Sequence, residues 1–280
     1  MAFPVCAQKP VPVYIVAGQS NADGRVPLSQ LPENVKANGY RHCLWSYGSG
    51  DMLLASGRFS PYKPHVAKAS DEDRWGFDAI LYQLLDSALD RPFYVIKQTV
   101  GGTAIDTLCQ RSTRGMYWCA APEYLAREHS ASRGGHSLLL ALKEQIDACI
   151  DSTLSRQPEG YEIRALVWHQ GEGDKQQADC YADNFRQLVC AIRQHLVSKT
   201  GRRRYRHLPV ICGTFAKGSR QGSPQVAKAL YELQQADSHV YVVDAHDLTL
   251  LPDRLHFDAA SAETLGRRMF GKLQELKLTK

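Results

Sequence analysis

A serine follows directly after an apolar stretch near the start of the chain. Residues 11–17 are mostly apolar and β-branched, and Gly18-Gln19-Ser20-Asn21 comes next. This pattern predicts a buried strand that stops in a sharp polar turn. A helix that starts just after the turn would aim its N–H groups at any charge developing on Ser20. Ser20 is therefore either a nucleophile or the N-cap of the next helix.

A second polar cluster near the C-terminus could activate that serine. A serine hydroxyl is a weak nucleophile at neutral pH and needs a base, and the base needs an acceptor that holds its tautomer. His256, with Asp253 three residues before it, can supply both roles from one short loop. Ser20, His256 and Asp253 together would form the catalytic set of an acyl-transfer enzyme.

Acyl transfer also needs hydrogen-bond donors for the oxyanion of its transition state. The candidates are the N–H of Ser20, an N–H of Gly101 or Gly102, and the side-chain amide of Gln170. Each follows a stretch that is predicted to be a strand. Three neighbouring residues are expected to contact the substrate: Gln19, Asn21 and Thr103.

Strands and helices alternate along the whole chain. Apolar, β-branched runs predict strands from residue 11 and at 92–100, 161–168, 208–215 and 240–244, and apolar residues at helical spacing predict helices at 71–89, 137–154, 179–199, 225–236 and 259–276. Segments 26–70 and 103–135 are expected to be largely irregular. The alternation predicts an α/β protein with a parallel sheet covered by helices on both faces. The polar clusters then meet at one edge of the sheet.

The four blocks resemble a known family when they are taken in order. Gly-Gln-Ser-Asn, Gly-Gly-Thr, Trp-His-Gln-Gly-Glu-Gly-Asp and Asp-x-x-His-Phe, spread over residues 18–257, are similar to the sequence blocks of SGNH-type hydrolases. The best match is the carbohydrate-esterase branch with sialate O-acetylesterases and acetylxylan esterases. The resemblance implies a three-layer, flavodoxin-like α/β/α fold around a mainly five-stranded parallel sheet. It also implies metal-independent removal of O-acetyl groups from a glycan.

The resemblance assigns roles to individual residues. By the family pattern Ser20 is the nucleophile and His256 the base. Gln170 stands where many members of the wider superfamily carry asparagine. Glu172 competes with Asp253 as the carboxylate that orients His256, and we favour Asp253 because its spacing to His256 is local.

Composition and charge narrow the function classes. The chain has 280 residues, of which 44% are hydrophobic and 22% charged, and a formal net charge of +5. No uninterrupted apolar run reaches about 18 residues, the length that spans a membrane. The clearest basic cluster, residues 202–206, is short and favours a solvated loop over a nucleic-acid site. We expect one catalytic domain at 11–280, no cofactor and no metal, because no CxxC pair and no metal-ligand motif is present.

The cysteines and the N-terminus bear on the compartment. Cys109 and Cys119 flank one loop and could pair in an oxidising compartment, whereas Cys149 and Cys190 lie in apolar helical patterns and are expected to be buried thiols. Residues 1–10 are expected to be disordered, and they resemble the last part of a secretory signal, with Val5 and Ala7 at the positions that a signal peptidase reads. That interpretation predicts a secreted or periplasmic protein, and an ordinary N-terminus a cytoplasmic one.

Three functions compete at this point. The leading hypothesis is a serine esterase that deacetylates a carbohydrate through an acyl-enzyme intermediate, with an acetylated glycan as its partner. The second is a carbohydrate-binding protein on the same fold that has lost catalysis, and the complete set of Ser20, Asp253 and His256 speaks against it. The third is a lipase or thioesterase, which would need an apolar acyl groove.

Overall fold

A twisted sheet lies at the centre of the computed structural model, which describes residues 9–49, 57–64 and 73–280. Seven strands form this sheet in the order β4 (Ser60–Pro61), β3 (Cys43–Ser49), β6 (Phe93–Thr99), β1 (Val11–Gly18), β7 (Tyr161–His169), β8 (Val210–Gly213) and β9 (Val240–Val243). Every neighbouring pair is parallel except the edge pair β3–β4. Two further strands, β2 (Val26–Pro27) and β5 (Arg74–Trp75), form a separate antiparallel pair. The α/β fold expected from the sequence is confirmed.

The five predicted strands are β6, β1, β7, β8 and β9, and they are adjacent in that order. Numbered along the chain, they follow the flavodoxin-like order 2-1-3-4-5. The expectation that 26–70 is largely irregular is wrong for residues 43–49, which form β3 and pair with β6. Its apolar signal is short and ends in glycine and serine, so pairing with a neighbouring strand decides its conformation more than propensity does.

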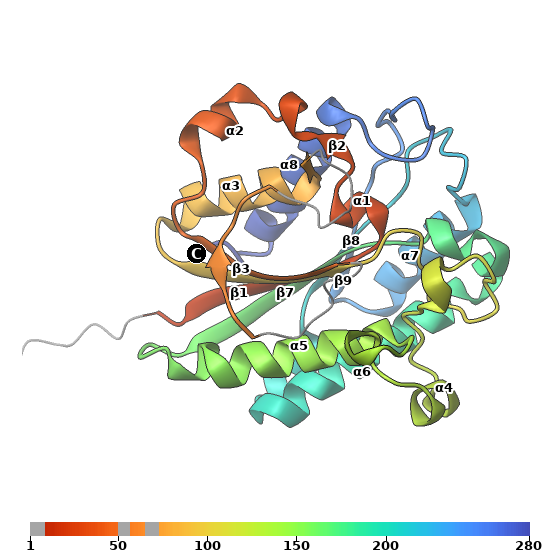
Figure 1. Cartoon of the computed structure of the whole chain (residues 1–280), viewed down its shortest axis with the longest axis horizontal. Helices are drawn as coiled ribbons and strands as arrows, with labels where there is room; N and C mark the ends of the chain where they lie inside the picture. Colours follow the sequence, from red (N-terminus) through yellow and green to blue (C-terminus); the bar gives the residue numbers. More distant parts are fainter. Residues whose placement is uncertain (1–8, 50–56, 65–72) are drawn as a thin grey trace, which may run out of the picture.

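Helices cover both faces of the sheet (Figure 1). One face carries α3 (Phe77–Leu89) and α8 (Ala259–Glu275), which pack against each other, and the other carries α5 (Leu138–Ser152), α6 (Tyr181–Thr200) and α7 (Pro224–Ala236). The short helices are α1 (Ser20–Asp23), α2 (Glu33–Asn38) and α4 (Pro122–Arg127). The 3₁₀ turns are Leu28–Gln30, Thr113–Gly115, Ala131–Arg133, Leu154–Arg156, Glu172–Cys180 and Arg203–His207. The predicted helix 71–89 begins at Phe77, because residues 74 and 75 belong to β5.

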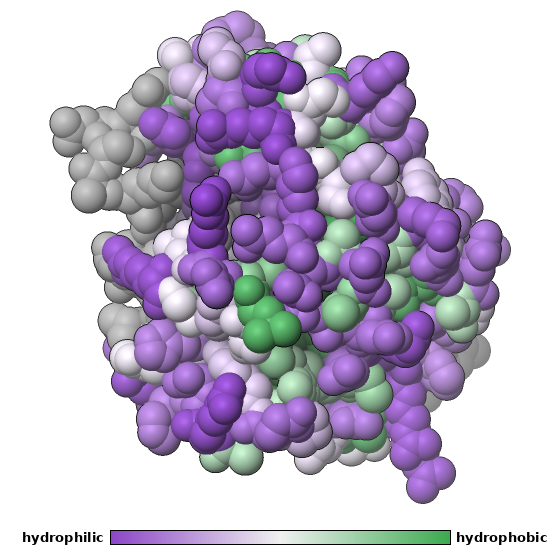
Figure 2. All heavy atoms as spheres, turned by 90° about the vertical axis from the view of Figure 1, so that its right-hand side faces the viewer, coloured by the Kyte–Doolittle hydropathy of each residue, from purple (hydrophilic) through white to green (hydrophobic). Residues whose placement is uncertain are grey.

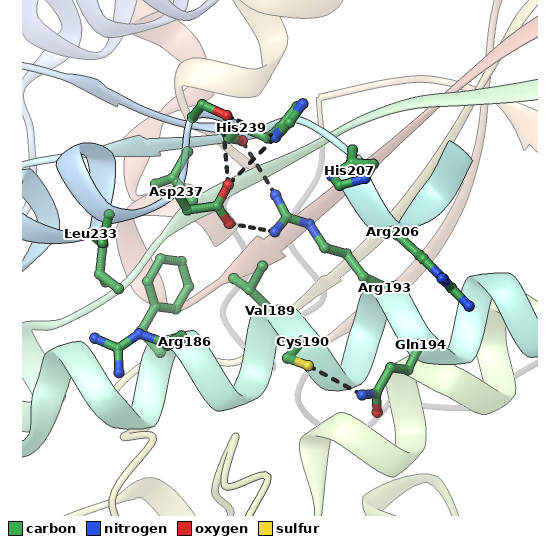
Figure 3. A pocket seen from close by; sticks show the side chains of 14 residues that line it. Arg186, Val189, Cys190, Arg193, Gln194, Arg206, His207, Leu233, Asp237 and His239 are labelled. Carbon is green, nitrogen blue, oxygen red and sulfur yellow. Dashed lines mark hydrogen bonds and ion pairs between the residues drawn. The ribbon is translucent and has the colours of Figure 1, made fainter. Parts of the chain in front are cut away.

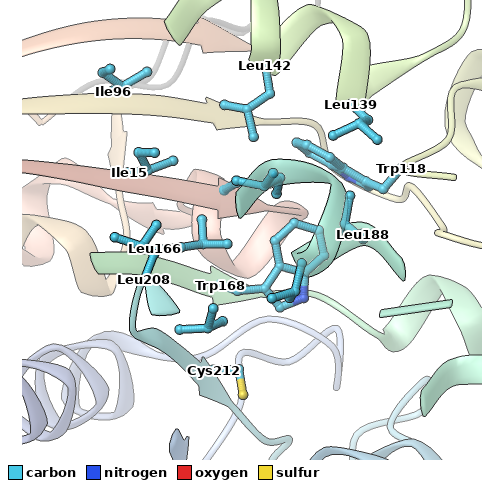
Figure 4. Close-up of a cluster of buried hydrophobic side chains, with 14 of the residues drawn as sticks. Ile15, Ile96, Trp118, Leu139, Leu142, Leu166, Trp168, Leu188, Leu208 and Cys212 are labelled. Atoms are coloured by element: carbon cyan, nitrogen blue, oxygen red, sulfur yellow. The ribbon is translucent and has the colours of Figure 1, made fainter. Parts of the chain in front are cut away.

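Alternate residues of the central strand β1 enter two separate cores. Val13 and Ile15 face the layer of α5, α6 and α7, whereas Tyr14 and Val16 face α3 and α8. Figure 4 shows the first core. In it the rings of Trp118 and Trp168 pack edge to face, with their centroids 5.2 Å apart. Because apolar layers cover both faces, polar chemistry is confined to the ends of the strands.

The cysteine expectations are met only in part. Cys109 and Cys119 are both free thiols in the structure, so the proposed disulfide is not formed. Cys149 is buried as expected, whereas Cys190 is exposed, because it lies beside the apolar stripe of α6 and not within it. The signal-like segment 1–8 lies outside the described residues.

Gly18 sets the exit of the chain from β1. Its φ is +144°, and a Cβ at this position would overlap the carbonyl oxygen of His169 on the neighbouring strand. Glycine therefore permits both the backbone conformation and the close approach of β1 and β7.

We expect Gly18→Ala to lower the free energy of unfolding by more than about 2 kcal/mol, because the change adds both a strained φ and a steric overlap. Urea unfolding measures this loss. Gly271→Ala is the matched control, since Gly271 lies in α8 with nothing near its missing Cβ. This control should gain up to about 1 kcal/mol from helix propensity. Equal urea midpoints for Gly18→Ala and wild type would show that the backbone conformation and strand contact at position 18 do not require glycine.

Candidate active site

The predicted chemistry gathers where β1 and β7 end. Gly18 pairs with His169 across these two strands, and the N–H of Gln19 donates to the His169 carbonyl at 3.0 Å. In an open sheet of this order, ligands bind at the carboxyl ends of the strands where the strand order reverses, which is at β1 and β7. Ser20 opens α1 at this point, and Glu172 opens the 3₁₀ turn that follows β7.

The side chain of Asn21 joins the serine turn to the histidine loop. Its Nδ2 donates to Glu172 Oε1 at 2.7 Å and to the carbonyl of Leu255 at 3.3 Å, and its Oδ1 accepts from the N–H of Phe257 at 3.2 Å. Leu255 and Phe257 flank His256 in the sequence. One buried amide therefore fixes the backbone on both sides of His256 relative to Ser20.

Asp253 is the carboxylate that contacts the histidine. Its Oδ2 lies 2.6 Å from His256 Nδ1, and its Oδ1 accepts from the N–H groups of Leu255 and His256 at 2.9 and 3.0 Å. Glu172, the alternative acid, accepts a hydrogen bond from Asn21. Among the described residues, the carboxylate that contacts the His256 ring is that of Asp253. Burial lowers the pKa of His256 below its usual 6.5, with Asp253 acting against burial by favouring the charged ring.

Two backbone N–H groups at the site have no acceptor among the residues that the structure describes. Within the described residues, the N–H groups of Ser20 and Gly101 make no hydrogen bond to protein. A Cβ built on Gly101 would lie 3.3 Å from Cβ of Ser20, so these two residues are adjacent. Gly102 is turned away toward Thr113, whose N–H donates to the Gly102 carbonyl at 2.9 Å. Ser20 and Gly101 are thus adjacent, and each carries an N–H group that no other described residue accepts.

Gln170 is placed differently from the expectation. Its Nε2 donates to the carbonyl of Thr103 at 2.9 Å and to Asp174 Oδ2 at 2.5 Å, so both amide hydrogens are engaged inside the protein. Asp174 also accepts from the N–H groups of Ile105 and Asp106, and burial raises the pKa of its carboxyl to about 6. Gln170 therefore anchors the loop after β6, and in this arrangement it has no hydrogen to offer an oxyanion.

The three residues expected to contact substrate are engaged inside the protein. Gln19 Oε1 accepts from the N–H groups of Gly171 and Gly173, and Thr103 Oγ1 donates to the carbonyl of Val100 at 2.8 Å. With Asn21, these side chains are almost completely buried. Through these contacts they connect the loops that form the site.

A buried group of charges beneath α1 escaped the sequence analysis. Asp23 accepts from Arg25 Nη1 at 2.7 Å, and Lys97 binds Asp78 at 2.8 Å and the carbonyl of Asp23 at 3.0 Å. Burial alone would raise the pKa of Asp23, but the charges of Arg25 and Lys97 hold it below its usual value. The available signal was the polar triplet Lys97-Gln98-Thr99 inside an apolar strand, which is unusual in a strand buried on both faces.

The surroundings of the site are mixed in polarity. Figure 2, which looks onto the edge where the parallel strands end, shows a band of apolar side chains across a mainly hydrophilic face. A cavity of about 700 Å³ lies elsewhere, between α6 and α7 (Figure 3). Its lining includes Arg193, Asp237 and His239, near the amino ends of the strands, and none of the predicted site residues.

Neither a metal-binding cluster nor a membrane-spanning helix is found among residues 9–49, 57–64 and 73–280. No three His, Cys, Asp or Glu side chains in them come together as a group that could hold a metal ion. No helix in them is long and apolar enough to cross a membrane.

Comparison with known families and structures gives a consistent picture. The family described as carbohydrate esterase, sialic acid-specific acetylesterase, matches residues 10–275. A structure from Arabidopsis thaliana is similar at 22% identity and a TM-score of 0.66, covering 95% of this chain and 98% of that one. The structure of NanS is similar at 16% identity and a TM-score of 0.66, covering 98% and 100%.

A third structure, XAC1771, is described as a novel carbohydrate acetylesterase from Xanthomonas citri. It is similar at 14% identity and a TM-score of 0.60, covering 96% of this chain and 56% of that one. At these identities the structural likeness establishes the fold. A search of curated proteins finds no match.

We expect Asn21→Ala to lower the free energy of unfolding by about 2 kcal/mol, because it leaves the Phe257 N–H and a Glu172 oxygen without their buried partner. Amide exchange at Phe257 should accelerate as the histidine loop is released, which NMR can follow. Asn184→Ala is the matched control: its amide makes one half-buried bond to Asp106, so its loss should stay below about 1 kcal/mol. Unchanged exchange at Phe257 would show that Asn21 does not hold the loop.

Proposed function

Because the chain belongs to the carbohydrate esterase family of sialic acid-specific acetylesterases, we propose that it is a serine esterase that removes O-acetyl groups from a glycan. The observation that carries the proposal is the convergence of Ser20, His256 and Asp253 at the strand-order reversal, joined by Asn21. The Ser20 hydroxyl and His256 Nε2 make no hydrogen bond with other described residues. Both atoms are therefore available for proton transfer.

The first half-reaction acetylates the serine. Ser20 Oγ attacks the acetyl carbonyl carbon while its proton passes to His256 Nε2, and Asp253 stabilises the resulting imidazolium through Nδ1–H. The tetrahedral intermediate carries a negative oxygen, to which the free N–H groups of Ser20 and Gly101 donate. The intermediate collapses by breaking the bond to the sugar oxygen, which takes the proton from His256. Acetyl-Ser20 and the free sugar hydroxyl result.

The second half-reaction restores the enzyme. Water attacks the acetyl carbon of acetyl-Ser20 and gives a proton to His256, and the same two N–H groups hold the oxyanion. The intermediate releases acetate as Ser20 Oγ regains its proton. Each half-reaction thus uses the same base and the same donors, so no metal or organic cofactor is needed in the scheme.

Substitution of the nucleophile tests the proposal. We expect wild-type protein to hydrolyse p-nitrophenyl acetate faster than the butyrate and octanoate esters, and Ser20→Ala to lower kcat by about 10⁴-fold or more. Wild type and Ser20→Ala are then assayed again in the presence of a chelator, and finally with acetylated sugars as substrates. Retained turnover in Ser20→Ala would exclude the serine mechanism. Equal rates with octanoate would favour a lipase-type activity, and glycan binding without turnover in wild type would favour a binding protein.

The pH profile tests the role of His256. The imidazole must be neutral to accept a proton, so activity is lost as pH falls through its pKa. Since burial lowers that pKa, the acid limb of kcat/KM should have its midpoint below 6.5. Asp253→Asn should move the midpoint further down, because the carboxylate favours the charged ring. A midpoint above 6.5, or no shift in the variant, would contradict the assignment.

A further inference from the structure

The excess positive charge of this protein gathers at the edge of the sheet opposite the candidate active site. Two hollows lie there, at the amino ends of the strands: the cavity of about 700 Å³ between α6 and α7, which we term the first hollow, and a second hollow of about 390 Å³ beside the start of β7. Their described lining residues include three Lys or Arg side chains in the first hollow and four in the second, against one carboxylate in each. The excess of five equals the formal net charge of the whole chain, +5.

The basic segment 202–206 forms the ridge between the two hollows. Tyr205 anchors this ridge, because it is buried and its hydroxyl accepts from a backbone N–H of β7 at 3.1 Å. Arg206 lines the first hollow, Arg204 lines the second, and His207 lines both. The hollows therefore adjoin, and one ordered 3₁₀ turn contributes a cation to each of them.

The first hollow combines a rigid wall with an unpaired cation. Arg193 pairs with Asp237 and donates to the backbone just before β8, so it ties α6 to the ends of two strands (Figure 3). The side chain of Arg206 is exposed and forms no ion pair with other described residues. Buried apolar side chains, among them Val189 and Leu233, complete the lining. An anion that enters this hollow therefore meets a free guanidinium beside apolar surface.

The second hollow also keeps positive charge after its internal pairing. Arg164 and Arg204 lie 3.6 and 3.2 Å from the carboxylate of Glu162, so two guanidinium groups share one negative charge. Lys277 and Lys280 line the same hollow, and both are exposed without an ion pair to other described residues. Like charges held this close attract a polyanion.

The shape and lining of the hollows favour one kind of anion. A chain of repeated negative charges can fill both hollows and cross the ridge, whereas a small anion would occupy only one of them. Nucleic-acid bases need exposed aromatic faces to stack on, and membrane binding needs apolar side chains that insert. Phe185 and Tyr205 line the hollows but are buried, and the exposed large hydrophobic residues in the described part of the chain, Leu108 and Tyr231, line neither hollow. An acidic polysaccharide needs neither feature, and its carboxylates match the arginine fork.

We propose that the two hollows and the ridge between them bind one linear acidic polysaccharide, whose carboxylates meet the cations on both sides of the ridge. The surface lies at the start of β7, and the candidate active site lies at the end of the same nine-residue strand, about 25 Å away. The inference thus goes beyond the proposed esterase reaction and does not depend on it.

The test measures the affinity for fluorescently labelled hexagalacturonate, which carries one carboxylate per sugar, by anisotropy at low salt. Arg206→Gln/Lys277→Gln removes one unpaired cation from each hollow. Arg127→Gln/Lys217→Gln is the matched control: it removes the same charge from two exposed side chains that line neither hollow and form no ion pair with other described residues. Thermal melts check that each variant is folded. Unlabelled digalacturonate, too short to cross the ridge, is tested as a competitor.

Wild type should bind hexagalacturonate, and Arg206→Gln/Lys277→Gln should bind it about 10-fold or more weakly, because two charge-assisted contacts are lost. The control variant should stay within about twofold of wild type, since isolated surface charges contribute little. Digalacturonate should compete at least about 10-fold more weakly than the unlabelled hexamer, because it cannot engage both hollows at once. Added salt should weaken binding by wild type more steeply than binding by the hollow variant.

Several results would overturn the proposal. Absence of hexagalacturonate binding by wild type would remove it outright, and an equal loss in both double variants would reduce the effect to net charge. Equal affinities for the dimer and the hexamer would confine the anion to one hollow. Tighter binding of dodecathymidylate or of phosphatidylserine vesicles, with the same loss in the hollow variant, would assign the surface to a nucleic acid or a membrane. Loss of hexagalacturonate binding in Ser20→Ala would place the chain in the candidate active site instead.

Discussion

The side-chain amide of Asn21 is the contact on which the geometry of the site depends. Ser20 and His256 lie at opposite ends of the chain, and neither side chain binds the other's loop directly. Asn21 connects them through both of its amide hydrogens and its amide oxygen, and the bond to Glu172 determines which end of the amide faces the histidine loop as donor. A shift of about 1 Å at such a junction is enough to misplace a proton transfer. Asn21 and Glu172 thus fix the positions of the serine turn and the histidine loop relative to each other.

The sheet supplies the frame for this junction. Gly18 brings β1 against the end of β7, so that the turn with Ser20 and the turn with Glu172 leave the sheet side by side. Gln170 and Asp174 then hold the loop after β6 against the same edge, which brings Gly101 to Ser20. Three neighbouring strands therefore each contribute one side of the site.

The sequence predicted the five central strands, the flavodoxin-like fold class that implies their order, and the polar residues at the strand ends. Apolar periodicity and polar breaks are local signals, so they can be recognised without the structure. The sequence also favoured Asp253 over Glu172, and this is the carboxylate that contacts His256. It could not place Gln170, Gln19 or Asn21 as internal anchors. Residue type shows that an amide can donate, whereas the acceptor it meets depends on loops far away in the chain. The burial of Arg25 was missed for the same reason: only the fold shows that it lies against Asp23 and Gly101.

The charges beneath α1 have a consequence for how this sequence can vary. Asp23, Arg25, Lys97 and Asp78 are two carboxylates and two cations that are all nearly buried. Replacing any one of them leaves an uncompensated charge in a medium that solvates it poorly, which is far more costly than replacing a pair. Substitutions at these four positions are therefore expected to occur in pairs that preserve the balance of buried charge. Among relatives, positions 23 and 25 should covary, as should positions 78 and 97, while the exposed loops around them diverge freely.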